Sequence, residues 1–287
     1  MTNNTMQRRI YAPHRTRAKG KFSIARKYVK AGLIGMCVLG MYNKSVAQTS
    51  ADPVKNIVLV HGAWVDGSGW KPVYDILVKD GYTVTLVQEP LTSFAEDVRA
   101  TKRVLDQQQG PCILVGHSYG GSVITEAGTD PHVVGLVYIA AHMPDTGESE
   151  AADGKRYPSA VTAANVIEKS SDGFIYLDRA EFPKYFAADL PPEQAEFEAQ
   201  SQIETAATVF MGKITTPAWR SKPSWMLVAK ADQIINPDLE RWYAKRAHSH
   251  TVEVDGASHS VYESHPDEVA AMIEDAAHQT RVADSHK

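Results

Sequence analysis

Cysteine is scarce in this chain, which excludes a fold held together by many disulfides. Only Cys37 and Cys112 occur among 287 residues. Cys112 lies in an apolar run, where a single thiol is more often buried filler than a nucleophile. If Cys37 is removed with a leader, no disulfide within the mature chain is possible, and stability must come from a hydrophobic core. With 43% apolar and 22% charged residues, a chain of this length has enough apolar material for one globular domain.

Acidic residues are missing from the first 47 positions, which instead hold ten Lys or Arg. A basic start, an apolar run over residues 31–41 and small residues at 45–47 have the layout of a secretory signal. We therefore expect residues 1–47 to be a cleaved signal peptide, with the mature chain starting near Gln48 and the protein secreted or periplasmic. A membrane anchor is disfavoured, because the apolar run is well short of the roughly 20 residues that a spanning helix needs. A pair of arginines near the start leaves a twin-arginine route open beside the general one.

The mature chain is short of positive charge. Removing ten of the 30 basic residues leaves 20 against 34 acidic ones, a formal charge of −14. This balance disfavours nucleic acid or an anionic membrane surface as a partner, and no stable membrane insertion is expected after signal cleavage. The sequence gives no indication of oligomeric state.

Short β-branched runs alternate with amphipathic helical segments along most of the chain. Strands are predicted at 56–60, 82–87, 112–115, 133–141, 224–229 and 251–254, and helices at 71–79, 94–109, 122–128, 237–247 and 266–278. This alternation is typical of a parallel sheet covered by helices on both faces. We expect one α/β core built from residues 48–142 and 222–280, followed by a loose tail over 281–287.

The alternation stops between residues 143 and 221, which are rich in Ala, Glu, Tyr and Phe. Helical segments are predicted at 160–169, 179–188 and 192–202. We interpret this segment as a helical cap inserted into the core.

Residues 116–120 read Gly-His-Ser-Tyr-Gly and fit the pattern G-x-S-x-G. Chance alone produces the pattern in about one chain in ten of this length, so its setting matters more than its letters. The motif follows the apolar strand 112–115 and precedes a helix, which is the strand-turn-helix setting of a nucleophile elbow. Ser118 is therefore the candidate nucleophile.

A base and a group to orient it are available after the last two predicted strands, and a serine hydroxyl needs both to become nucleophilic. Asp232 lies just past the strand at 224–229, and His259 follows the last strand. The chain order Ser118, Asp232, His259 is the one that elbow-type hydrolases use. Asp238 competes with Asp232, but it stands at a predicted helix start, where a carboxylate stabilises the helix dipole.

The negative charge of a tetrahedral intermediate needs fixed donors, usually two backbone N–H groups. One is expected from Tyr119, directly after the nucleophile, and the other from Ala63 in the loop after the first strand.

The candidate substrate contacts are Trp64, His142, Phe186, Phe210 and Trp219. Ordinary packing inside the cap explains such aromatic residues equally well. No metal site and no cofactor are predicted.

Three stretches of sequence, together with Asp232 and His259, carry a family resemblance. Residues 58–64 (VLVHGAW), 116–121 (GHSYGG) and 140–145 (AAHMPD) resemble the α/β hydrolases grouped with plant methyl esterases and hydroxynitrile lyases. The resemblance spans residues 56–277 and is weak through the cap. It implies an α/β-hydrolase fold with a sheet of about six mainly parallel strands and helices on both faces. It also implies a Ser-His-Asp triad, an oxyanion hole at Ala63 and Tyr119, no cofactor, and a substrate held between core and cap.

Two positions depart from the lyase branch of that family, which has Thr where this chain has Gly62 and Lys where it has Ser260. Cyanohydrin cleavage is therefore disfavoured. Epoxide hydrolases and dehalogenases have Asp at the elbow, where this chain has Ser118. The favoured hypothesis is a carboxylesterase-type serine hydrolase that cleaves a small ester through an acyl-enzyme. The alternatives are a ligand-binding or receptor-like protein with negligible turnover, or a perhydrolase, lyase or cofactor-free oxygenase on the same scaffold.

Overall fold

A computed structural model describes the chain from residue 53 to residue 280. The predicted signal peptide (1–47) and the predicted tail (281–287) lie outside these residues. Within the described range, no helix combines the length and the apolar character that crossing a membrane requires.

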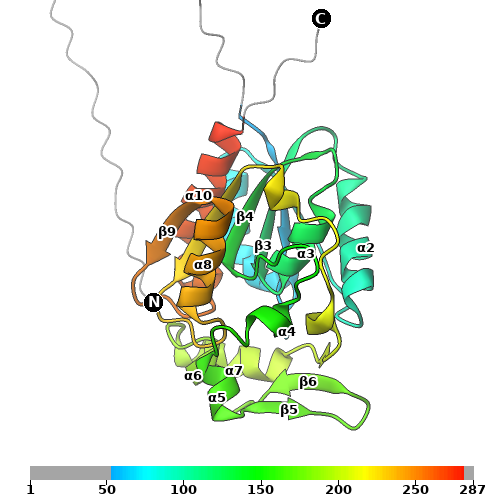
Figure 1. Ribbon diagram of the computed structural model, residues 1–287. Helices are drawn as coiled ribbons and strands as arrows, with labels where there is room; N and C mark the ends of the chain where they lie inside the picture. Colours follow the sequence, from blue (N-terminus) through cyan, green and yellow to red (C-terminus); the bar gives the residue numbers. More distant parts are fainter. Residues whose placement is uncertain (1–52, 281–287) are drawn as a thin grey trace, which may run out of the picture. The chain divides into compact units, whose positions relative to one another are not determined.

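A sheet of six parallel strands forms the centre of the fold, as the sequence predicts (Figure 1). In spatial order the strands are β2 (Thr83–Leu86), β1 (Asn56–Val60), β3 (Cys112–Ser118), β4 (Val133–Ala141), β8 (Ser224–Ala229) and β9 (His250–Val254). The order of the strands reverses between β1 and β3. In open parallel sheets, ligands bind outside the carboxyl ends of the strands at such a reversal. The topology therefore places a site where Val60 and Ser118 end their strands.

Helices cover both faces of this sheet, and each face has its own apolar core. The helices α1 (Lys71–Lys79) and α10 (Pro266–Gln279) pack on one face. The helices α2 (Phe94–Leu105), α3 (Gly120–Ala127) and α8 (Pro237–Ala247) pack on the other. All seven residues of β3 are buried, which is the pattern of a strand covered on both sides.

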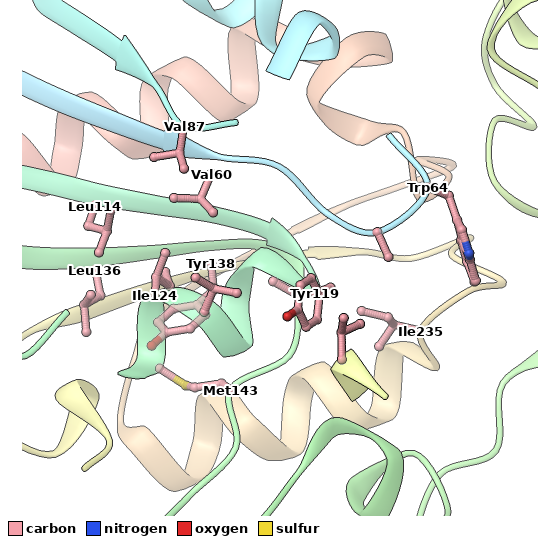
Figure 2. Close-up of a cluster of buried hydrophobic side chains, with 14 of the residues drawn as sticks. Val60, Trp64, Val87, Leu114, Tyr119, Ile124, Leu136, Tyr138, Met143 and Ile235 are labelled. Carbon is pink, nitrogen blue, oxygen red and sulfur yellow. The ribbon is translucent and has the colours of Figure 1, made fainter. Parts of the chain in front are cut away.

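Apolar side chains from strands and helices meet on the α2–α3–α8 face. Figure 2 shows Leu114 of β3 near Leu136 of β4, with Ile124 of α3 next to them. Each of these three side chains is fully buried, and burying one such side chain contributes about 1.5–3 kcal/mol. Tyr119 and Trp64 lie further along, beyond the strands, where this core reaches the loops at the carboxyl edge.

Capping side chains fix where two of these helices begin. Ser93 precedes α2, and its hydroxyl accepts a hydrogen bond from the Glu96 N–H at 3.3 Å. Asn236 precedes α8, and its side-chain oxygen accepts from the Asp238 N–H at 3.0 Å, with Pro237 at the first helical position. Such caps satisfy backbone donors that a helix start leaves unpaired.

The insertion 143–221 contains helices, as predicted, and also a small antiparallel sheet that the sequence patterns did not predict. Its elements are α4 (Glu150–Asp153), α5 (Ala160–Ala164), β5 (Ile167–Lys169), β6 (Phe174–Leu177), α6 (Phe182–Tyr185), α7 (Pro192–Ser201), β7 (Thr205–Ala206) and the 3₁₀ turns η2 (Val209–Met211) and η3 (Ala218–Arg220). Figure 1 shows β5 and β6 as a hairpin at the far edge of the insertion.

Two of the three helices predicted in the insertion are wrong in extent. The helix predicted at 160–169 ends at Ala164, because Asn165 takes a left-handed conformation with φ 54° and the following residues pair with β6. The helix predicted at 179–188 is reduced to the single turn α6. The third, predicted at 192–202, matches α7.

Two hydrogen bonds to the backbone of Trp64 join the insertion to the core beside the carboxyl edge of the sheet. The Ile203 N–H donates to the Trp64 carbonyl at 2.9 Å, and the Trp64 N–H donates to the Thr205 hydroxyl at 3.1 Å. The insertion therefore lies over the loop that follows β1, next to the end of β3.

Candidate active site

Ser118 stands at the end of β3 in a strained conformation. Its φ is 54°, in the left-handed region that non-glycine residues rarely adopt. The turn is tight enough that a Cβ added at Gly116 would lie 2.6 Å from the Gly120 carbonyl oxygen. A side chain larger than hydrogen therefore does not fit at position 116. The strain raises the Ser118 side chain above the end of the strand, in the manner of a nucleophile elbow.

The loop after β1 approaches Ser118 closely because residue 62 is glycine. A Cβ added at Gly62 would lie 2.7 Å from the Ser118 Cβ, inside any van der Waals contact. The same loop is held by His61, whose Nε2 accepts from the Glu89 N–H at 2.9 Å and whose Nδ1 donates to the Gly62 carbonyl at 2.8 Å.

The backbone N–H groups of Ala63 and Tyr119 belong to residues next to the nucleophile. Ala63 follows Gly62 in the loop that approaches Ser118, and Tyr119 follows Ser118 in the chain. Among the hydrogen bonds within residues 53–280, neither group is found as a donor. Tyr119 is held in place by its side chain, since its hydroxyl donates to Asp97 at 2.7 Å. Neither N–H group is therefore occupied by another acceptor within the described residues.

Ser118, His259 and Asp232 form one hydrogen-bonded row. The His259 Nε2 lies 2.8 Å from the Ser118 Oγ, and the His259 Nδ1 lies 2.6 Å from an oxygen of Asp232. The second oxygen of Asp232 accepts from the N–H groups of Ile234 and Ile235 at 2.7 and 3.0 Å. The carboxylate accepts the Nδ1 proton, so the Nε2 lone pair faces the Ser118 hydroxyl.

Asp238, the alternative to Asp232 from the sequence, lies elsewhere. It is in the first turn of α8, where its carboxylate accepts from Arg241 at 2.8 Å. The geometry therefore joins Asp232, and not Asp238, to His259.

The loop that carries His259 is held by the insertion, through residues that the sequence analysis did not identify. The Phe186 carbonyl accepts from the Ser260 N–H at 3.0 Å. The Phe186 ring contacts the His259 ring edge-on, with 4.7 Å between the ring centroids. Asp189 accepts from the Ser258 N–H at 2.9 Å, from the Ser258 hydroxyl, and from the Ser264 hydroxyl at 2.8 Å. No local sequence pattern reveals these contacts, because they join segments about 70 residues apart.

A cavity of about 220 Å³ opens beside the Ser118 hydroxyl. Its wall is mainly apolar and comes from the insertion, from the loop before α8 and from the first turn of α8. The apolar residues are Val161, Ile167, Ile175, Phe210, Ile234, Ile235 and Leu239. A volume of this size suits a small ligand, since an engineered cavity of about 150 Å³ holds benzene.

Of the five predicted substrate contacts, Trp64, His142 and Phe210 line this cavity. Phe186 and Trp219 do not line it. Phe186 is fully buried against His259, and the Trp219 indole N–H donates to the Pro144 carbonyl at 3.0 Å.

The cavity also contains Glu150, which the sequence analysis missed because the residue belongs to no motif. Within residues 53–280, no group of three or more His, Cys, Asp or Glu side chains is arranged to hold a metal ion. Cys112 is buried in β3, and burial raises the pKa of its thiol to about 12. It is therefore not a nucleophile at neutral pH.

A six-stranded parallel sheet with a strained serine at the end of its third strand defines an α/β hydrolase. Residues 57–272 match the alpha/beta hydrolase family, and the chain belongs to this family.

The chain is also similar to particular proteins that are named as esterases. Methylesterase 8 of Arabidopsis thaliana is 24% identical over 229 residues, which cover 71% of this chain and 83% of that protein. The carbendazim hydrolyzing esterase of Nocardioides sp. (strain SG-4G) is 35% identical over 108 residues, covering 33% of this chain and 45% of that protein. The crystal structure of polyneuridine aldehyde esterase has a TM-score of 0.67 at 18% identity, over 77% of this chain and 98% of that one. This last likeness concerns the fold.

Proposed function

We propose that this protein is a serine esterase that hydrolyses a small carboxylic ester through an acyl-enzyme. The observation that carries the proposal is the row of hydrogen bonds from Ser118 through His259 to Asp232, beside a small apolar cavity. Relatives named as esterases, both plant and bacterial, support the choice of an ester bond.

In the proposed reaction, the Ser118 oxygen attacks the ester carbonyl carbon while His259 Nε2 takes the hydroxyl proton. Asp232 keeps Nδ1 protonated and stabilises the imidazolium that forms. The N–H groups of Ala63 and Tyr119 bind the oxyanion. Collapse of the intermediate breaks the bond to the alcohol oxygen, which leaves with the proton from His259. Water then attacks the acyl-enzyme with His259 again as base, releasing the acid and restoring Ser118.

A binding protein without turnover is the second candidate, and it shares the cavity but does not need an activated serine. Purified protein and its Ser118→Ala variant are compared on short p-nitrophenyl esters. The esterase proposal expects release of p-nitrophenol that depends on Ser118, whereas equal slow release from both proteins favours binding alone.

We also propose export, because residues 1–47 have the layout of a cleaved signal and the mature chain is acidic. Mass spectrometry of the protein recovered from its native host tests this proposal. A first residue near Gln48 supports it, and a chain that retains residues 1–47 in the cytoplasm contradicts it.

A further inference from the structure

Two ionisable side chains line the otherwise apolar cavity beside Ser118. His142 follows β4, and its backbone N–H donates to the Ser118 carbonyl at 3.2 Å. Glu150 begins α4 in the insertion. Their side chains are 8% and 13% exposed, and both line the cavity. Burying such groups costs free energy unless they are hydrogen-bonded, so their presence in an apolar cavity calls for a function.

The hydrogen bonds of Tyr243 indicate which nitrogen of His142 carries a hydrogen. The Tyr243 hydroxyl donates its single proton to Asp153 at 3.0 Å. The Tyr243 oxygen lies 3.3 Å from the His142 Nδ1, so Nδ1 carries a hydrogen and donates it. The His142 Nε2 is then an acceptor, and it lies 3.2 Å from the Oε1 of Glu150. A lone pair beside this oxygen repels a carboxylate, so the contact favours the protonated form of Glu150.

The electrostatics of the cavity agree with a neutral pair. Burial raises the pKa of Glu150 to about 8, and Asp153 on α4 raises it further against the lowering effect of the Ser122 hydroxyl on α3. Burial, together with the nearby His259, lowers the pKa of His142 to about 3. The phenol of Tyr243 faces the pair from α8. At neutral pH the pair is an uncharged acid beside an uncharged imidazole.

One oxygen of the pair remains available to a ligand. Glu150 Oε2, the carbonyl oxygen of the protonated acid, accepts only from the Ser122 hydroxyl, at 3.3 Å, and a carbonyl oxygen has two lone pairs. Among the other polar groups of the residues that line the cavity, the hydroxyls of Ser159 and Thr162 lie 3.0 Å apart, and the Asn236 amide donates to the Pro158 carbonyl. The Trp64 indole N–H has no hydrogen-bond partner within the described residues.

We propose that His142 and Glu150 form a specificity site that accepts a hydrogen bond from a hydroxyl or amide N–H on the apolar part of the ester substrate. The cavity has room for one ring or an alkyl group of similar size. The reaction that follows binding rests on the proposed esterase function, whereas the binding preference does not.

The test uses two series of esters, with a phenyl ring on the acyl side (methyl 3-phenylpropanoates) or on the alcohol side (2-phenylethyl acetates). Each series contains the parent and its ortho-, meta- and para-hydroxy derivatives. Affinity is measured by calorimetry on Ser118→Ala, and kcat/KM on the protein with Ser118. At least one hydroxylated ester is expected to bind about three- to tenfold more tightly than its parent, the effect of one neutral hydrogen bond.

Variants of Glu150, made in the same Ser118→Ala background, separate a ligand contact from a structural role. Glu150→Gln keeps a donor for His142 Nε2 and a carbonyl oxygen for the ligand, so it is expected to retain the preference. Glu150→Met removes both and is expected to abolish it. The matched control is Glu148→Gln, a neighbouring carboxyl that accepts from Arg246 at 2.7 Å and does not line the cavity. Glu148→Gln is expected to leave the ratio of the affinities for hydroxylated and parent esters unchanged.

Equal affinity for parent and hydroxylated esters in both series overturns the specificity site. Loss of the preference in Glu150→Gln overturns the neutral acceptor and points to a carboxylate that binds cations. If the binding preference is found but turnover does not depend on Ser118, the specificity site is supported. The esterase proposal is then rejected.

Discussion

In the six-stranded core, strands and helices alternate regularly along the chain, whereas the insertion 143–221 consists of short elements, several of which contact distant segments of the core. The atoms proposed to react come from core loops at strand ends. The insertion instead supplies much of the cavity wall and holds the loop of His259 through Phe186 and Asp189. The comparison teaches that the proposed chemistry resides in the core, while substrate choice and part of the alignment reside in the insertion.

The largest expected effect concerns the core. Asp232→Asn removes the charge that keeps His259 Nδ1 protonated, so kcat is expected to fall by about four orders of magnitude. Circular dichroism is expected to be unchanged, because the amide fills the same space. Asp238→Asn, at the start of α8, is the matched control and is expected to keep kcat within about twofold. Comparable losses in both variants contradict the assignment of Asp232.

A smaller effect is expected from Gly62→Ala, which tests the close approach of the first core loop. The added Cβ lies 2.7 Å from the Ser118 Cβ, so the loop or the serine must move. A displacement near 1 Å costs about a hundredfold in kcat. Steady-state kinetics on a p-nitrophenyl ester measure this loss, and an unchanged kcat shows that the loop does not constrain Ser118.

Asp189→Ala tests whether the insertion aligns His259. The variant removes the acceptor for Ser258 and Ser264, so kcat is expected to fall about tenfold while KM changes little. Hydrogen exchange in residues 258–265 is expected to accelerate. Ser264→Ala, which removes one of these contacts, is expected to have a smaller effect. A change in KM alone places Asp189 in substrate binding instead.

The last prediction concerns stability and not catalysis, namely the pH dependence of the free energy of unfolding. Burial raises the pKa of Glu150 to about 8 in the folded state, above its usual value of 4.5. Between these values the folded state holds a proton that the unfolded state has released, so this group lowers stability as pH rises from about 4.5 to about 8. Glu150→Gln lacks this term. Relative to the variant, the wild-type free energy of unfolding is expected to decrease by a few kcal/mol over this range, as urea titrations at several pH values measure. A difference that does not vary with pH contradicts a buried neutral acid.

The sequence predicted the core well because its signals are local. Strand runs, the G-x-S-x-G turn and the positions of Asp232 and His259 after strands are readable within a few residues each. The roles of these residues stay proposals, but their convergence at one sheet edge follows from parallel strands ending together.

The insertion was harder to predict because its structure depends on tertiary contacts. The strand β5 has three residues and no clear periodicity, and it forms only because β6 pairs with it. Glu150 and Asp189 have no motif, and their importance depends on what the fold places opposite them. Phe186 and Trp219 are aromatic residues in the expected segment, yet packing directs both away from the cavity.

The proposed activation of Ser118 is tested most directly by a fluorophosphonate probe followed by peptide mass spectrometry. A serine made nucleophilic by His259 is expected to carry the label on the peptide containing Ser118, and the label is expected to be lost in His259→Ala. An unlabelled Ser118 in folded protein, or equal labelling with and without His259, contradicts the account.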